Sequence, residues 1–337
     1  MRRWNLSQLI GTIALSVAIW AVVAAGCLLV GSTGVYWPTV QELTLRREPV
    51  LVASLVGAAL GAAGCAYQAV LRNPLADPYL LGASSGAALA AYVWRLPMLG
   101  GLLTAPGTLG VIFAEAGQEA FAFFGALGAI VIVLAVAAAR LRGRLEPVTL
   151  LLVGVIVNAV NGSIYLLLIA IHKDNPGGGG EASLLIGGIR LVTHLQLCVA
   201  AGLAAVGAIV LFFLSGKLSV AVLGDDEIES LGVNVHRLRW AALSGASLAT
   251  AAAVAVSGPI AFVGLICPHI ARRLVGSDQR RLLPAATAAG AILLVLADAV
   301  SRLLAWQNLL GTQLQVGILT GLLGGPFFLF LLKDKKI

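Results

Sequence analysis

Residues 240–271 read WAALSGASLATAAAVAVSGPIAFVGLICPHIA and contain no Asp, Glu, Lys or Arg. A helix that crosses a bilayer needs about 20 mainly apolar residues, so this stretch can cross once and begin a second crossing. A Ser-Gly-Pro turn at 257–259 interrupts it. We expect one helix up to about Val256, a turn, and a shorter helix from Ile260. The stretch indicates a helical fold embedded in a membrane.

The composition of the whole chain supports the same class. Of the 337 residues, 59% are hydrophobic and only 11% are charged, whereas soluble domains are about 45–50% apolar and about 25% charged. A compact soluble protein of this composition would expose too much apolar surface to water. Ordinary soluble enzymes, nucleic-acid-binding proteins and disordered proteins are therefore excluded as first interpretations.

With 240–271 counted as two helices, the chain contains ten runs that are apolar enough to be membrane spans. They are 4–41, 49–71, 78–94, 120–139, 147–171, 191–216, 240–256, 260–271, 282–297 and 303–332. The run 96–114 is set aside, because its prolines and glycines make a continuous helix unfavourable. We expect 96–119 to form an extracytoplasmic loop, which could contain a half-buried helix.

The distribution of basic residues tests this topology. With a cytoplasmic N-terminus and ten spans, most of the 22 Lys and Arg residues lie on the inner side. The outer group is Arg46, Arg47, Arg95, Lys173, Arg190 and Arg302. If 96–114 crossed the membrane, every later loop would change sides and the balance would reverse, against the positive-inside rule. The sequence thus predicts an all-α polytopic membrane protein with ten transmembrane helices, cytoplasmic N- and C-termini, and a single transmembrane domain over 1–337.

The chain shows no pattern of its own for metal, nucleotide or covalent chemistry. The four cysteines lie far apart in apolar runs, and His269 has no partner at ligand spacing. No G-x-x-x-x-G-K-[ST] motif for phosphate occurs. We expect no catalytic, cofactor-binding or metal-binding residues, so any ATP would have to bind another subunit.

Two polar features remain within this apolar chain. The loop 217–239 is the longest on the predicted cytoplasmic side, and its acidic start and later glycine predict a short exposed helix near 225–231. Such a helix suits the docking of a partner, although a simple solvated connector remains open. Asp298 and Arg302 are four residues apart with the acid first, which favours an intrahelical ion pair over a functional carboxylate.

Four motifs together resemble a known family. They are RNPLADPYLLGASSGAALAA at 72–91, SLGVNVHRLR at 230–239, SGPIAFVGLICPHIARRLVGSDQRRLLP at 257–284 and VGILTGLLGGPFFLFLL at 316–332. They are similar to the FecCD/BtuC-type permease subunits of bacterial ABC importers for iron-siderophore complexes, haem and vitamin B12. The resemblance covers nearly the whole chain.

The resemblance implies the type II ABC importer permease architecture and a set of partners. Two permease subunits, here a homodimer, would enclose a central path, and two cytoplasmic ABC ATPase subunits would carry ATP and Mg. The 217–239 loop would be the coupling loop. Its expected ATPase contacts are Asp225, Asp226, Glu227, Glu229, Ser230, Leu231 and Gly232. A periplasmic or lipid-anchored binding protein would dock on the outer face. Membrane lipid is the remaining expected partner, and no nucleic acid is expected.

The resemblance also suggests docking and path residues. Arg46 and Arg302 match arginines that meet the binding protein in the family, and Arg47 could substitute for a displaced arginine, because R-x-P-R reads Arg46-Arg47-Glu48-Pro49 here. The fifth span would line the path. The polar path candidates are Asn158, Asn161 and Ser163, and the candidates for the cytoplasmic exit are Asn73, Leu80, Pro147, Val148 and Thr149. Interhelical hydrogen bonding is an equal alternative for Asn158 and Asn161.

The implied activity is import of a metal chelate across the bacterial inner membrane by alternating access. The competing interpretation is an ion-coupled secondary transporter. That class usually needs several intramembrane ionisable groups in a relay, and Asp298 alone qualifies clearly here.

Overall fold

The computed structural model describes residues 6–32, 34–96, 108–140, 147–172, 186–222, 229–230, 232–307 and 314–333. These residues form ten α-helices, one short 3-10 helix (η1, Pro78–Leu81) and a hairpin of two short antiparallel strands, β1 (Val30–Gly31) and β2 (Gly34–Val35). The helices are α1 (Leu6–Leu28), α2 (Val40–Val70), α3 (Ala83–Arg95), α5 (Thr108–Arg140), α6 (Pro147–Ile171), α7 (His194–Ala221), α9 (Val235–Ser257), α10 (Val263–Val275), α11 (Gln279–Trp306) and α12 (Val316–Lys333).

The ten helices correspond one to one with the ten apolar runs, which confirms the all-α membrane fold. Seven of them, α1, α2, α5, α6, α7, α9 and α11, are long and apolar enough to cross a membrane. The other three are shorter: α3 and α10 have 13 residues each and α12 has 18. At 1.5 Å per residue, α3 and α10 extend only about 20 Å. Helix α3 follows η1, and α10 follows the turn at 258–262. Parts of both turns are buried inside the bundle.

The segment 96–119, expected as a loop that could hold a half-buried helix, is helical over its second half. Helix α5 begins at Thr108 and continues without a break to Arg140, while 97–107 lie outside the described residues. The prolines of this region all precede Thr108, so they do not interrupt α5, and Gly110 lies within the helix. Gly117, also inside the helix, packs closely against the ring of Trp94 on α3.

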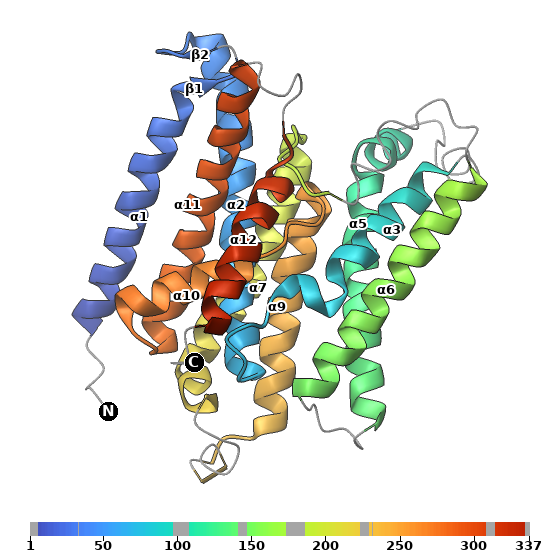
Figure 1. Ribbon diagram of the computed structural model, residues 1–337, viewed down its shortest axis with the longest axis vertical. Helices are drawn as coiled ribbons and strands as arrows, with labels where there is room; N and C mark the ends of the chain where they lie inside the picture. The colour runs from blue at the N-terminus through green and yellow to red at the C-terminus, as the bar shows by residue number, and fades with distance from the viewer. Residues whose placement is uncertain are drawn as a thin grey trace.

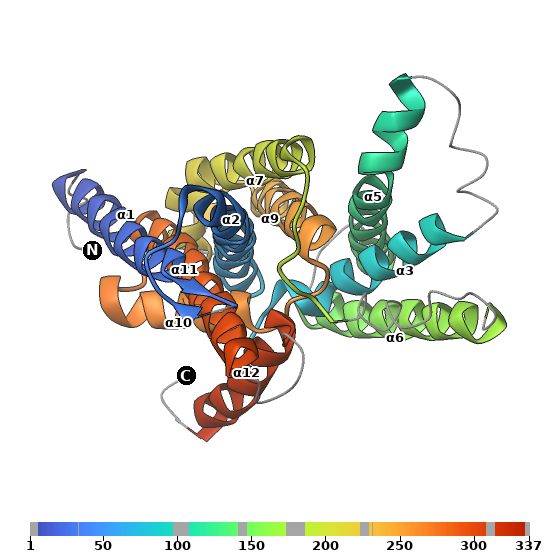
Figure 2. The same cartoon turned by 90° about the horizontal axis from the view of Figure 1, so that it is seen from above.

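Helix α2 occupies the centre of one group of helices, with α1, α7, α9 and α11 around it (Figure 2). Its contacts are made through glycines. A Cβ atom added to Gly57 would lie 2.1 Å from the carbonyl oxygen of Gly290 on α11, and one added to Gly64 would lie 2.0 Å from the carbonyl oxygen of Gly264 on α10. In a bilayer there is little hydrophobic force between helices, so such close backbone approach supplies the packing energy.

The two ends of the bundle differ in charge. Helix α1 begins, and α12 ends, at the lower end in Figure 1, where α7 also ends and α9 begins. The described basic residues at the helix ends of this side are Arg72, Arg140, Lys217, Arg237, Arg239, Arg272, Arg273, Arg280, Arg281 and Lys333. The opposite end carries Arg46, Arg47, Arg190 and Arg302. The start of α1, the end of α12 and most of the described basic residues therefore lie at the same end of the bundle, as the ten-span topology predicts.

The glycine contacts predict a specific sensitivity of the bundle. We expect Gly57→Ala to lower the free energy of unfolding by about 1–3 kcal/mol, because the new methyl group would collide with the backbone of Gly290. The measurement is the midpoint of thermal unfolding in detergent. The matched control is Gly202→Ala on α7, where an added Cβ meets nothing within 4 Å. Equal midpoints for the two variants would contradict a rigid α2–α11 contact.

Candidate functional site

The motifs at 72–91 and 257–284 meet at Asp77. This residue follows α2 and caps η1, and its Oδ1 atom accepts a hydrogen bond from the backbone N–H of Tyr79 at 2.8 Å. Burial raises the pKa of Asp77 to about 6, and the backbone N–H groups of Tyr79, Phe262 and Leu265 act in the opposite direction. The carboxyl group thus lies between the start of η1 and the start of α10.

Gln68 completes this junction from α2. Its Nε2 atom donates to the carbonyl oxygens of Gly264 at 3.2 Å and Leu265 at 3.4 Å, and its Oε1 atom accepts from Arg272 Nη2 at 3.1 Å. The turn before α10 has two residues with positive φ, Gly258 at 68° and Phe262 at 69°. For a phenylalanine this backbone conformation is uncommon and must be held by its surroundings. The motifs at 72–91 and 257–284 therefore form one rigid junction.

Helix α6 is attached to this region by its two asparagines. Asn158 Nδ2 donates to the carbonyl oxygen of Tyr79 at 3.1 Å, and Asn161 Nδ2 donates to Ser85 Oγ at 3.2 Å. The alternative of hydrogen bonding between elements is thus observed for both residues. Ser163 is exposed and donates to the carbonyl oxygen of Ala159 in its own helix, at 2.8 Å.

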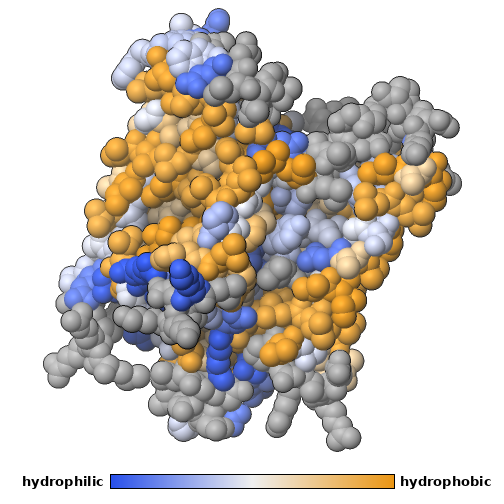
Figure 3. Space-filling model, in the orientation of Figure 1, coloured by the Kyte–Doolittle hydropathy of each residue, from blue (hydrophilic) through white to orange (hydrophobic). Residues whose placement is uncertain are grey.

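The outward face of α6 is apolar along its length. Exposed side chains on this helix are Val148, Leu152, Val155, Ile156, Val160, Ile164, Leu166, Leu167 and Ile171. Figure 3 shows this surface as a hydrophobic region at the right of the molecule. It offers a weakly interacting wall with few groups that could bind a polar cargo.

The remaining exit candidates surround the inner end of α6 and the turn after α2. The side chain of Asn73 accepts a hydrogen bond from the backbone N–H of Leu75 at 2.9 Å, which closes a local Asx-type turn. Pro147 is the first residue of α6, Val148 is exposed, and Thr149 is half-buried. Leu80 belongs to η1, which packs against α6, but the structure does not describe its side chain or that of Pro147. Their roles at an exit stay predictions.

Two predicted docking arginines are buried at the outer end of the bundle. Arg46 is 7% exposed and Arg302 is 6% exposed. Arg46 Nη1 donates to the carbonyl oxygens of Leu28 at 3.2 Å and Leu29 at 3.0 Å, and its guanidinium lies 4.6 Å from the centre of the Tyr36 ring. In this structure Arg46 therefore joins α2 to the end of α1 and the hairpin.

Arg302 fixes the same hairpin from α11. Its Nη2 atom pairs with Asp298 Oδ2 at 2.9 Å, as the spacing predicted, and its Nη1 atom donates to the carbonyl oxygen of Val30 at 2.8 Å. A cavity of about 370 Å³ lies beside both guanidinium groups and is also lined by Glu42. Arg47, in contrast, is exposed. The charge count grouped these arginines at one end of the bundle, where the structure also has them, but it held no signal for their burial.

The predicted coupling loop is only partly described. Asp225, Asp226, Glu227 and Leu231 lie outside the described residues, whereas Glu229 and Ser230 are helical and exposed. The N–H of Gly232 donates to the carbonyl oxygen of Glu229 at 2.9 Å, and Gly232 has a φ of 73°, a conformation typical of the residue after a helix. Asn234 then caps α9 by accepting from the N–H of Arg237. The ATPase contact of this loop stays a prediction.

The described residues offer no metal centre. Within the described ranges, no group of three or more His, Cys, Asp or Glu residues could hold a metal ion. The ring of His269 packs edge-on against Phe327, with 5.7 Å between centroids. This contact is a packing arrangement and agrees with the structural role preferred from the sequence.

Comparison with known proteins gives the relationship of the chain. The model of the FecCD transport family matches residues 5–334. The chain is 37% identical to the hemin transport system permease protein HmuU of Yersinia pestis, over 87% of this chain and 83% of that protein. It is 36% identical to the cobalamin import system permease protein BtuC of Halobacterium salinarum, over 87% of this chain and 73% of that protein.

A solved structure shows the same architecture. It is a metal-chelate type ABC transporter in an inward-facing conformation, with a TM-score of 0.79 and 25% identity, covering 96% of this chain and 98% of that chain. The match of the family model over almost the full length, the helix order and the two relatives all agree. The chain therefore belongs to the FecCD transport family and is a multi-pass membrane permease of the ABC transporter class, whose ATPase is a separate subunit.

Proposed function

We propose that this permease imports a metal chelate, namely an iron-siderophore complex, haem or a corrinoid, across the bacterial inner membrane. The observation that carries the proposal is the family match over residues 5–334, together with relatives named for hemin and cobalamin import. A bulky chelate suits a path with apolar walls, because a surface that bound the cargo tightly would retain it. Selectivity would then belong mainly to the binding protein.

The proposed assembly is a homodimer with two cytoplasmic ATPase subunits and a periplasmic or lipid-anchored binding protein. In this assembly ATP and Mg bind the ATPase subunits and this chain binds no cofactor. The basic end of the bundle is assigned to the cytoplasm by the positive-inside rule. That assignment places both termini and the 217–239 loop inside, and Arg46, Arg47 and Arg302 outside.

In the proposed mechanism, closure of the ATPase dimer moves the 217–239 loop, and helices around the path alternate between outward-open and inward-open arrangements. The exposed face of α6 would form the wall of the path between two copies of the chain, with Ser163 on it. Asn158 and Asn161 would act by holding α6 on η1 and α3. Val148, Thr149, Asn73, Leu80 and Pro147 would narrow the inner exit.

The structure gives little support to ion-coupled transport. Such a transporter usually needs a chain of intramembrane ionisable groups. Among the described helices, Asp298 is buried but already pairs with Arg302. Uptake by the reconstituted permease, ATPase and binding protein decides between the two classes. The proposal requires uptake that depends on ATP, and uptake driven by a pH gradient without the ATPase would overturn it.

The acidic segment of the coupling loop provides the first test. We expect replacement of 225–231 by a Gly/Ser linker to abolish co-purification of the ATPase, because the predicted docking helix and its charge would be lost. The permease should still insert and elute as a folded species. The control is Glu181→Gln, on the predicted outer side. A stable ATPase complex after the linker replacement would show that coupling lies elsewhere.

The outer arginines provide a second test that separates docking from support. We expect Arg47→Glu to weaken binding-protein affinity by up to about fivefold at low salt and less at high salt, because exposed charge pairs are screened. Arg273→Glu, at the opposite end, is the matched control. An affinity unchanged by Arg47→Glu would remove this residue from the docking surface.

The buried pair calls for a different measurement. We expect Arg302→Gln to lower the free energy of unfolding by about 3–5 kcal/mol, because it leaves the buried Asp298 carboxylate without its partner. The double variant Asp298→Asn/Arg302→Gln should recover much of that loss. Thermal unfolding in detergent measures both effects. Asp298→Asn alone is measured as well. If the loss of unfolding free energy in the double variant equals the sum of the losses in Arg302→Gln and Asp298→Asn, the pairing is contradicted.

A further inference from the structure

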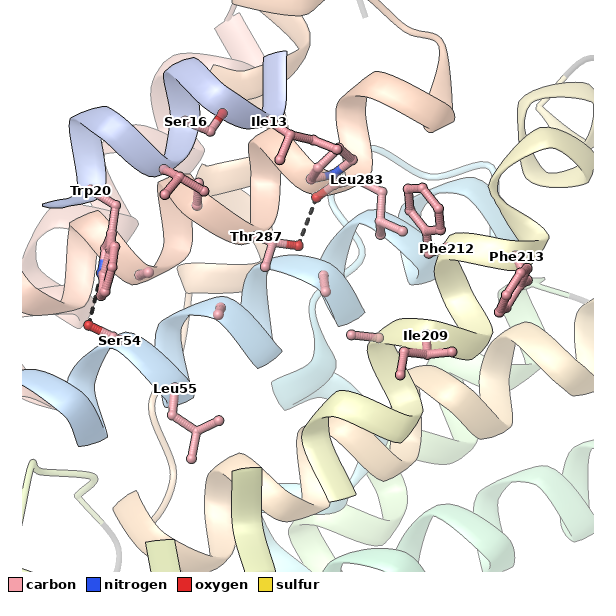
Figure 4. Close-up of a pocket in the computed structure, with 17 residues that line it drawn as sticks. Ile13, Ser16, Trp20, Ser54, Leu55, Ile209, Phe212, Phe213, Leu283 and Thr287 are labelled. Carbon is pink, nitrogen blue, oxygen red and sulfur yellow. Dashed lines mark hydrogen bonds between the residues drawn. The ribbon is translucent and has the colours of Figure 1, made fainter. Parts of the chain in front are cut away.

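A large cavity lies between α1, α2, α7 and α11, away from the outer arginines and the coupling loop (Figure 4). Its volume is about 790 Å³, within the range of about 300–1,000 Å³ that is usual for small-molecule sites. The cavity is open on one side, so in a bilayer its apolar walls would contact hydrocarbon.

The walls of the cavity are mainly apolar, and three of its four polar side chains, Trp20, Ser54 and Thr287, are hydrogen-bonded. Trp20 Nε1 donates to Ser54 Oγ at 3.0 Å, and that hydroxyl donates to the carbonyl oxygen of Val50 at 2.7 Å. Thr287 Oγ1 donates to the carbonyl oxygen of Leu283 at 2.8 Å. Figure 4 shows the Trp20–Ser54 and Thr287–Leu283 bonds and the surrounding hydrocarbon side chains. Water would find few partners here, whereas a hydrocarbon chain would be well accommodated.

The cavity opens onto the apolar outer surface of the bundle. Its inner wall includes Ala62, which is buried, and its outer rim includes Val17 on α1 and Phe213 on α7, which is 79% exposed. Phe213 and Ile209 lie on one side of the opening and Ile13 on the other. A chain from the surrounding bilayer could therefore enter sideways between α1 and α7.

Basic residues lie about one helical turn below this opening, on the basic end of the bundle. Arg281 on α11 donates to Thr12 Oγ1 at 3.4 Å and Gln8 Oε1 at 3.3 Å, both on α1 just before Ile13. Lys217 is exposed and lies four residues after Phe213, on the same face of α7. Arg280 lies against Gly216. Among the described residues Asp278 is an acidic neighbour, and its carboxylate accepts from Ser219 and from the N–H of Arg280.

We propose that this cavity is a binding site for an anionic phospholipid, with one acyl chain between α1 and α7 and the phosphate headgroup at Lys217, Arg280 and Arg281. The two halves of the site match the two halves of such a lipid: an apolar slot and, at its lower edge, a surplus of positive charge. Basic pockets between transmembrane helices on the cytoplasmic side favour anionic headgroups. The lipid would connect α1 to α7 where the protein leaves a gap.

The first test compares headgroups on one acyl chain. The full-length permease is purified in detergent, and retention of dioleoyl phosphatidylglycerol and dioleoyl phosphatidylethanolamine is measured by native mass spectrometry. We expect preferential retention of the anionic lipid. Lys217→Gln and Arg281→Gln should each reduce that preference roughly fivefold, the effect of about one cation at an anionic surface. Arg237→Gln, an exposed arginine at the same end, should leave it unchanged.

The second test fills the slot. Ala208→Phe on α7 places a ring in the cavity and should lower retention of both lipids, whereas Ala205→Phe, exposed on the same helix and outside the cavity lining, should not. A third measurement covers the case of a misfolded variant. Phosphatidylglycerol with brominated chains should quench Trp20 fluorescence in the parent protein, seen as the part of the quenching that Trp20→Phe removes.

Three outcomes would overturn the proposal. Equal retention of the two lipids by the parent protein would remove the headgroup site. Unchanged retention in a folded Ala208→Phe variant would mean that the slot holds another occupant, such as the N-terminal residues or a second copy of the chain. Absence of Trp20 quenching by the brominated lipid would place the acyl chain elsewhere.

Discussion

Backbone-to-backbone contact along α2 is the constraint on which the rest of this permease depends. Gly57, Gly61 and Gly64 bring α2 against the carbonyl oxygens of Gly290, Ala286 and Gly264, closer than any side chain would allow. Lipid is as apolar as the helices themselves, so fit rather than expulsion from water holds this group together. The buried length of α2 then provides the fixed surface on which α1, α7, α9, α10 and α11 pack.

The polar residues of the bundle are used mainly to attach turns to this fixed surface. At the outer end, Arg46 and Arg302 hold the β1–β2 hairpin through carbonyl oxygens. In the region between α2 and α10, Gln68 and Asp77 connect the start of α10 to the turn before η1. These four side chains therefore satisfy backbone polar groups that water cannot reach in this part of the protein.

Much of the fold could be predicted from the sequence, because membrane thickness and charge asymmetry are strong signals. The run 147–171 coincides with α6, and the Ser-Gly-Pro interruption separated α9 from α10 as expected. Helix α5 begins earlier than the run 120–139, because Gly110, which counted among the helix-breaking residues of 96–114, lies within the helix. The close packing of Gly117 on Trp94 of α3 is long-range information that the sequence does not hold.

The candidate site was less predictable than the fold. The charge count grouped Arg46 and Arg302 at one end of the bundle, but a count of charges says nothing about the carbonyl oxygens that surround them. Spacing within one helix was sufficient for the Asp298–Arg302 pair. The partners of Asn158 and Asn161 lie on η1 and α3, far away in the chain, so the sequence left two alternatives where the structure shows one arrangement.

The interlocked glycines also determine where the molecule can bend. Figure 2 shows α3, α5 and α6 on one side of the group that surrounds α2, and α3 and α5 pack on α9 there. The turn between α2 and α3 contains Gly82, whose φ of 86° is open to glycine and strained for other residues. Sliding α2 along α11 would break close backbone contacts, and moving the second group would break the core that α3 and α5 share with α9. The interlocked glycines thus resist shear along α2, and a change of shape would have to act on the packing against α9.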